Sequence, residues 1–195
     1  MKRMAELDRR LVVECLLQGR KDLLVVTGLG SAAYDVMAAG DHDRNFYLWG
    51  AMGSAAMIGF GLARAQPERP VLVLTGDGEM LMGMGSLASI AVMKPRNLTI
   101  VVLDNEHYGE TGMQLSHSGK GVELSQVAKV CGFDWCSEIK DMQGVQALRP
   151  RMSAFEGLNF ASIKIKAEDA PRVLPPRDGV YVKNRMRASL GFSPI

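Results

Sequence analysis

The chain has 195 residues, 47% of them hydrophobic and 23% charged, which is typical of a globular protein with a full apolar core. A formal net charge of +2 and an aromatic content of 6% argue against a nucleic-acid-binding protein. The apolar stretch 11–17 is short and is interrupted by Glu14, so we predict neither a secretion signal nor a membrane span. The three cysteines, Cys15, Cys131 and Cys136, lack paired or zinc-type spacing, which indicates free thiols and a cytoplasmic protein.

Apolar strand segments and helical segments alternate along the chain. In chain order we expect a helix at 3–18, a strand at 23–26, a helix at 31–38, a strand at 46–48, a helix at 53–65, a strand at 71–74, a helix at 79–93, a strand at 98–103, helices at 122–131 and 141–152, and a strand at 161–165. The strand segments are continuously apolar, which is typical of a parallel sheet that is buried on both faces. The predicted fold class is therefore α/β, with a parallel sheet flanked by helices on both faces.

The composition changes near Glu168. We predict one α/β domain at 1–167 and a C-terminal arm at 168–195. Prolines are frequent in the arm, so we expect it to be extended and to end in a short basic helix at 183–188. We also expect it to pack on a partner subunit.

A carboxylate between two glycines follows the strand predicted at 71–74. This turn is Gly76-Asp77-Gly78, and Asn105 follows the strand predicted at 98–103. In α/β sheets ligands bind beyond the carboxyl ends of the strands, where both turns fall. The glycines allow a ligand to approach the backbone closely, and a helix start attracts phosphate. Because Mg²⁺ prefers oxygen ligands, the two turns suggest Mg²⁺ carrying a diphosphate, although Gly-Asp-Gly alone is often an ordinary turn.

The motif Gly76-Asp77-Gly78, followed after 26 residues by Asn105, resembles the cofactor motif of thiamine-diphosphate-dependent enzymes. The resemblance continues in two further segments, 49–55 and 103–114. Within this superfamily the chain is similar to the β subunits of sulfopyruvate decarboxylases and to the related half of phosphonopyruvate decarboxylases. The resemblance implies a pyrophosphate-binding domain with thiamine diphosphate and Mg²⁺ as its cofactors.

The resemblance also implies roles for individual residues. Mg²⁺ is expected to be bound by the side chains of Asp77 and Asn105 and by the carbonyl of His107. The residues expected to line the diphosphate are Gly30, Ser31, Gly76, Gly78, Glu79, Tyr108 and Gly109. Gly50 is expected to accept a hydrogen bond from the aminopyrimidine, and Met52 is expected to support the bent cofactor.

Four polar residues are candidates for contacts with the substrate: Glu106, His107, Glu110 and Gln114. We have no preference among them. The sequence departs from the common pattern at Glu79, where relatives often have Ser or Ala, and at Met113, where they often have Gly. Because a carboxylate would repel a diphosphate, we expect the side chain of Glu79 to point away from it.

Enzymes of this kind also need a pyrimidine-binding domain that supplies an activating glutamate, and a chain of this length has no room for it. We therefore expect an α subunit that carries this domain, and a hetero-oligomer with the cofactor at the interface. The activity implied is that of a carboxy-lyase: decarboxylation of a small anionic 2-oxoacid, such as sulfopyruvate or phosphonopyruvate, to an aldehyde and CO₂.

Other functions stay open. The chain is also compatible with a thiamine-dependent carboligase or with the β subunit of a 2-oxoacid oxidoreductase, although its cysteines lack iron–sulfur spacing. A non-catalytic assembly or regulatory subunit is a further alternative, which the intact pair Asp77 and Asn105 disfavours. A plain nucleotide-binding module is disfavoured because Gly28-Leu29-Gly30 lacks the full dinucleotide spacing.

Overall fold

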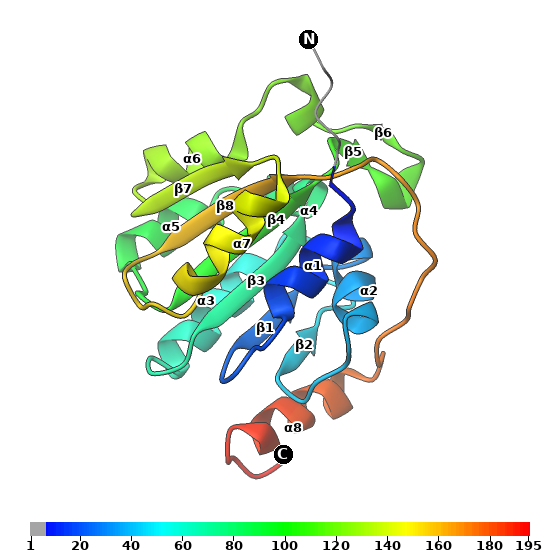
Figure 1. Ribbon diagram of the computed structural model, residues 1–195. Helices are drawn as coiled ribbons and strands as arrows, with labels where there is room; N and C mark the ends of the chain where they lie inside the picture. The colour runs from blue at the N-terminus through cyan, green and yellow to red at the C-terminus, as the bar shows by residue number, and fades with distance from the viewer. Residues whose placement is uncertain (1–6) are drawn as a thin grey trace.

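The computed structural model describes residues 7–195 and contains a six-stranded sheet in the order β2-β1-β3-β4-β8-β7 (Figure 1). All neighbouring strands in this sheet are parallel. The strands are β1 (Leu24–Thr27), β2 (Asn45–Tyr47), β3 (Val71–Gly76), β4 (Leu98–Asp104), β7 (Trp135–Ile139) and β8 (Asn159–Lys164). The strand order reverses at β1, so a ligand-binding crevice is expected at the carboxyl ends of β1 and β3.

Helices cover both faces of the sheet, which confirms the predicted fold class. One face carries α1 (Arg9–Leu17), α2 (Ser31–Ala38) and α7 (Met142–Arg151), and the other carries α3 (Ala55–Ala65), α4 (Asp77–Met82), α5 (Ser86–Met93) and α6 (Leu124–Cys131) (Figure 1). Successive residues of a strand point to opposite faces, so Leu72 joins one apolar core and Val73 the other. This arrangement explains why the strands are apolar at every position.

The sequence predicted one helix at 79–93, and this prediction is wrong. The structure has two helices, α4 and α5, separated at Gly83–Gly85. A Cβ atom on Gly83 would lie 2.1 Å from the carbonyl oxygen of Gly53, so the two backbones are in direct contact. This close approach requires glycine where the helix ends.

Other boundaries differ for identifiable reasons. The first helix was predicted at 3–18, but within the described residues it begins at Arg9, because the side chain of Asp8 accepts hydrogen bonds from two backbone N–H groups and caps it. Strand β7 was not predicted, because it is a half-exposed edge strand without an apolar run. Four short elements after β4 were also missed: β5 (His107–Tyr108), the 3₁₀ turn η1 (Gly109–Thr111), β6 (Gln114–Leu115) and the 3₁₀ turn η2 (Ser118–Lys120).

The C-terminal arm leaves β8 and runs past the β5–β6 hairpin and α2 to α8 (Gly179–Ser189), which lies beside β2 (orange to red in Figure 1). The basic helix predicted at 183–188 is thus part of a longer helix, which the side chain of Asp178 caps. Val182 and Met186 are the residues of this helix that are buried. The arm therefore packs on its own domain, and its packing on a partner stays a prediction.

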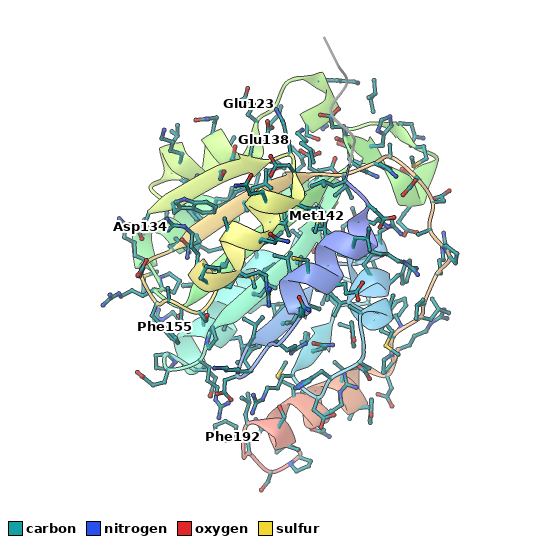
Figure 2. All side chains as sticks on the ribbon, in the orientation of Figure 1. Glu123, Asp134, Glu138, Met142, Phe155 and Phe192 are labelled. Carbon is teal, nitrogen blue, oxygen red and sulfur yellow. The ribbon has the colours of Figure 1, made fainter. Side chains whose placement is uncertain are left out.

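Figure 2 shows Glu123 and Glu138 near the carboxyl edge, beside the hairpin side of the molecule, whereas Phe155 lies at the opposite edge. Within the described part of the chain, no helix is long and apolar enough to cross a lipid bilayer.

Candidate cofactor-binding site

Asp77 and Asn105 lie at the carboxyl ends of two adjacent strands. Gly76 of β3 is paired in register with Leu103 of β4, so Asp77 follows one strand where Asp104 and Asn105 end the other. Asp77 is the first residue of α4 and is only 2% exposed. The structure thus places the two residues that the sequence singled out at neighbouring strand ends.

The carboxylate of Asp77 is held by two serines. Oδ2 of Asp77 accepts a hydrogen bond from Ser116 Oγ at 2.5 Å, and Ser118 Oγ lies 3.1 Å from the same oxygen. Burial raises the pKa of the Asp77 carboxyl above its usual range, and the nearby charge of Asp104 acts in the same direction, against the two serine hydroxyls. The sequence analysis missed both serines, because they lie in a loop without a motif.

Asp104 differs from Asp77 because it has a cationic partner. Lys164 Nζ lies 2.8 Å from Oδ2 of Asp104 and 2.8 Å from Oε1 of Glu106. Burial lowers the pKa of Lys164, but its contacts with these two carboxylates prevail and raise the pKa above its usual value. Among the described residues no Lys, Arg or His lies within ion-pair distance of Asp77. Asp77 is therefore a buried carboxylate without a protein cation.

The chain reverses sharply after β4. Oδ1 of Asn105 accepts a hydrogen bond from the backbone N–H of His107 at 3.0 Å, and Nδ1 of His107 lies 2.8 Å from the carbonyl oxygen of Asn105. Glu106 lies between them with a φ of 64°, a left-handed conformation that is uncommon for a non-glycine residue. The imidazole of His107 therefore folds back on the turn.

Three of the predicted cofactor contacts meet at Gly78. A Cβ atom on Gly78 would lie 2.9 Å from Cδ1 of Tyr108 and 3.9 Å from Cε of Met52. The Tyr108 hydroxyl in turn lies 2.5 Å from Nδ1 of His117. Met52 is 42% exposed and so offers an apolar surface beside this glycine.

Glu79 is buried, and its carboxylate accepts hydrogen bonds from two separate backbone segments. Its Oε2 accepts hydrogen bonds from the N–H of Leu29 at 3.0 Å and from Thr75 Oγ1 at 2.9 Å, and its Oε1 accepts one from the N–H of Ala55 at 3.3 Å. A side chain at Gly28 would collide with this carboxylate, since its Cβ would lie 1.7 Å from Oε2. Glu79 thus ties the first glycine turn to the start of α3.

The first glycine turn also meets the hairpin. Gly30 has a φ of 77°, and a Cβ atom there would lie 2.8 Å from Oε1 of Glu110. A cavity of about 80 Å³ opens at this junction, and the residues that line it include Arg9, Ser31, Asn105, His107, Gly109 and Glu110. Residues predicted from separate segments therefore line one cavity.

Two predicted residues lie outside this cluster. Gly50 is exposed, and a Cβ atom there would have no neighbour within 4 Å. Gln114 is exposed, and its side-chain amide pairs with Thr111, donating to the carbonyl at 2.9 Å and accepting from the hydroxyl at 3.1 Å. The roles predicted for both residues stay predictions.

Comparison with known proteins identifies the family. The family described as thiamine pyrophosphate enzyme, C-terminal TPP binding domain, matches residues 30–173. The chain belongs to this family. The resemblance seen in the sequence motifs is thereby confirmed.

Two curated members of the family are similar over much of their length. The chain is 43% identical over 116 residues to sulfopyruvate decarboxylase subunit beta of Methanocaldococcus jannaschii, a match that covers 60% of this chain and 61% of that one. It is 38% identical over 164 residues to the subunit of the same name from Methanothermobacter thermautotrophicus, covering 84% of this chain and 85% of that one.

The fold is shared with larger enzymes. The crystal structure of benzoylformate decarboxylase from Polynucleobacter necessarius superposes with a TM-score of 0.72 at 20% sequence identity. The match covers 85% of this chain but only 34% of that enzyme. The chain therefore shares its fold with about a third of that enzyme.

The residues present fit the cofactor of the family. Gly78 leaves a space between Tyr108 and Met52 that a side chain would fill. The buried Asp77 lacks a protein cation and sits beside a carboxamide and a backbone turn, a set of oxygen donors that suits a hard cation. The described residues contain no group of three or more His, Cys, Asp or Glu side chains placed to hold a metal ion.

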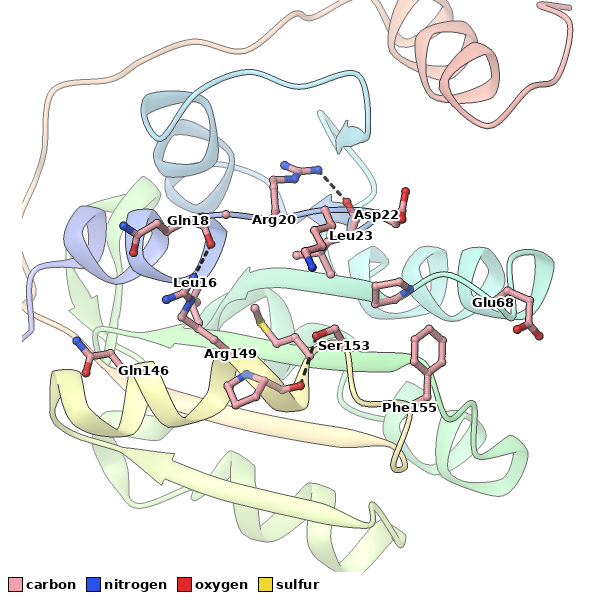
Figure 3. A pocket seen from close by; sticks show the side chains of 15 residues that line it. Leu16, Gln18, Arg20, Asp22, Leu23, Glu68, Gln146, Arg149, Ser153 and Phe155 are labelled. Atoms are coloured by element: carbon pink, nitrogen blue, oxygen red, sulfur yellow. Dashed lines mark hydrogen bonds between the residues drawn. The ribbon is translucent and has the colours of Figure 1, made fainter.

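A second cavity, of about 550 Å³, lies at the opposite edge of the sheet (Figure 3). Two of its arginines pair with backbone carbonyls of lining residues: Arg20 donates to the carbonyl of Leu23 at 2.9 Å, and Arg149 donates to the carbonyl of Gln18 at 2.5 Å. It contains none of the predicted site residues. The predicted site residues therefore lie outside this cavity.

Proposed function

We propose that the chain is the β subunit of a thiamine-diphosphate-dependent 2-oxoacid decarboxylase that acts on a small anionic 2-oxoacid of the sulfopyruvate or phosphonopyruvate type. The observation that carries the proposal is the buried Asp77, without a protein cation, beside Asn105 at the carboxyl edge. The similarity to sulfopyruvate decarboxylase β subunits supports the choice of reaction.

In this proposal Asp77 and Asn105 bind Mg²⁺ through their side chains, and His107 binds it through its carbonyl. Ser116 and Ser118 hold one oxygen of Asp77, which leaves the other oxygen for the cation. A divalent cation also compensates the cost of burying this carboxylate. Lys164 neutralises Asp104, so the site presents one uncompensated carboxylate rather than two.

The diphosphate lies along the glycine turns. Its proposed contacts are Gly30, Ser31, Gly76, Gly78, Tyr108 and Gly109. The carboxylate of Glu79 bridges two turns, so Glu79 is proposed to line the diphosphate through its backbone N–H and not through its side chain. Gly50 and Met52 extend the site towards the aminopyrimidine.

When bound, thiamine diphosphate supplies the carbon nucleophile and the electron sink that decarboxylation of a 2-oxoacid requires. The residues of this chain that reach the substrate are proposed to be Glu106, His107, Glu110 and Gln114. Glu110 is nearest to the first glycine turn, and His107 is held by the turn after β4.

We further propose an α partner that carries the pyrimidine-binding domain. The two matched relatives are named as beta subunits, and the fold match covers only 34% of the larger benzoylformate decarboxylase chain.

The test is co-purification of the full chain with its partner, followed by titration of thiamine diphosphate in the presence of Mg²⁺. Asp77→Ala should abolish cofactor binding, whereas Asp43→Asn, at an exposed residue, should not change it. Unchanged affinity in Asp77→Ala would refute the site. Aldehyde formation from sulfopyruvate or phosphonopyruvate by the wild-type complex tests the reaction, and acyl-CoA or acyloin as the product would refute it.

A further inference from the structure

The C-terminal arm crosses the outer rim of the candidate site. It starts beside the N-terminal segment, where Lys166 N–H donates to the carbonyl of Leu7 at 2.9 Å. It ends at α8, where Arg185 lies 2.6 Å from Oδ2 of Asp41 and donates to the carbonyl of Asn45 at 3.2 Å. Between these two anchors the arm touches both loops that flank the site.

The first contact is an ion pair with a site residue. Arg172 Nη2 lies 3.5 Å from Oε2 of Glu110, and its guanidinium lies 5.9 Å from the ring centre of Tyr34. The other carboxylate oxygen of Glu110 faces Gly30, where the diphosphate is proposed to bind. A carboxylate at this place repels a diphosphate, and Arg172 offsets its charge.

The second contact holds the loop before Met52. The indole N–H of Trp49 donates to the carbonyl of Pro176 at 2.7 Å, and the guanidinium of Arg177 lies 5.1 Å from the Trp49 ring centre. Trp49 directly precedes Gly50, the proposed aminopyrimidine contact.

The two contacts are linked. The rings of Tyr34 and Trp49 lie 6.4 Å apart at an angle of 52°. Arg172, Tyr34, Trp49 and Arg177 therefore form a continuous series of two adjacent aromatic rings with a cation at each end, and each neighbouring pair is within the range of a favourable contact. The arm supplies both cations, and the domain supplies both rings.

We propose that the C-terminal arm is a clamp that shapes the cofactor site, with Arg172 and Arg177 as positioning residues that act through Glu110 and Trp49. The cofactor's identity in this inference rests on the proposed function, but the docking of the arm does not. Arg172 offsets the negative charge of Glu110 where the diphosphate is proposed to bind. Arg177 holds Trp49, and with it the loop that leads to Gly50, where the aminopyrimidine is proposed to bind.

Docking of the arm is tested in the full chain without cofactor. The chain has two tryptophans, so Trp135→Phe leaves Trp49 as the single reporter. In this background, with folding checked by circular dichroism, Arg177→Ala should shift the Trp49 emission to longer wavelength and increase its quenching by acrylamide. Arg187→Ala is the matched control, because Arg187 stacks on Phe192 at 5.7 Å, beyond the clamp. Equal spectra for the two variants would overturn the clamp.

The charge effect of Arg172 is tested by thiamine diphosphate affinity in the complex with the partner. Arg172→Ala should weaken binding about fivefold, and Arg172→Lys should stay within about twofold of wild type, since an exposed ion pair contributes modestly. Adding Glu110→Gln to Arg172→Ala should restore the affinity, because the repulsive charge is then gone. Failure of this rescue would overturn the role of Arg172. If the wild-type complex binds no thiamine diphosphate, the proposed function fails, while the Trp49 spectra still decide whether the arm docks.

Discussion

The hydroxyl of Ser116 lies 2.5 Å from Oδ2 of Asp77, although 39 residues separate the two in sequence. This hydrogen bond joins the segment after the β5–β6 hairpin to the first residue of α4. Since Asp77 is buried, the loss of a donor leaves one of its oxygens poorly satisfied.

Ser116→Ala should weaken Mg²⁺-dependent binding of thiamine diphosphate by about tenfold, the expected effect of losing one hydrogen bond to a buried charged group. The measurement is calorimetric titration of the complex at saturating Mg²⁺. Ser153→Ala is the control, because the Ser153 hydroxyl is exposed and contacts only the carbonyl of Pro150 at 3.4 Å. Equal affinities for the two variants would contradict the role of Ser116.

Gly78→Ala should abolish cofactor binding without unfolding the chain. The new methyl group would meet Tyr108 at 2.9 Å and fill the space that the cofactor is proposed to use. Gly85→Ala is the matched control, since its Cβ would meet nothing within 4 Å and its φ of −60° suits alanine. Cofactor affinity by titration and secondary structure by circular dichroism distinguish the two effects, and wild-type affinity in Gly78→Ala would count against the site.

Two glycines of α3 should respond in opposite ways to alanine. Gly59→Ala should destabilise the fold by about 1–3 kcal/mol through overpacking, because its Cβ would lie 2.1 Å from Cγ2 of Val73. Gly61→Ala should instead stabilise it by about 0.5–1 kcal/mol, since helix propensity improves and the site is open. Urea unfolding measures both, and destabilisation of Gly61→Ala by as much as Gly59→Ala would show that α3 packs differently.

Docking of α8 should weaken in acid through Asp41. Burial raises the pKa of this carboxyl, but hydrogen bonds from Arg185, Tyr47 and the backbone N–H of His42 prevail and lower the pKa below its usual value. A lowered folded-state pKa means that the stabilisation is present above the unfolded pKa and is lost as the pH falls through the folded pKa. Asp41→Asn should therefore be less stable than wild type at pH 7, and the difference should shrink below about pH 4. Urea unfolding at pH 7 and pH 3.5 measures this, and a difference independent of pH would refute the assignment.

Much of the site could be predicted from the sequence because it follows from local rules. Asp77 and Asn105 each end an apolar strand, and consecutive strands of a parallel α/β unit lie side by side, so their meeting needs only the strand order. Ser116 was not predictable, because its approach to Asp77 depends on how the hairpin returns, and polar loop residues give no periodic signal.

The errors in the fold prediction also occur where the local sequence carries no signal of the structure. Strand β7 is an edge strand whose residues include Ser137 and Glu138, so burial imposes no apolar pattern on it. The helix predicted at 79–93 ends early because of the contact between Gly83 and Gly53, two residues far apart in sequence. The helical pattern of the sequence continues through residues 83–85, so the break between α4 and α5 is seen only from the tertiary contact.

That contact between Gly53 and Gly83 has a mechanical consequence. With no side chain between the two backbones, the turn that carries Met52 rests directly on the end of α4, and the start of α4 carries Asp77. Asp77 and Met52 are therefore connected through α4, one at each of its ends. If a cation binds at Asp77 as proposed, we expect any shift of α4 to displace Met52 as well.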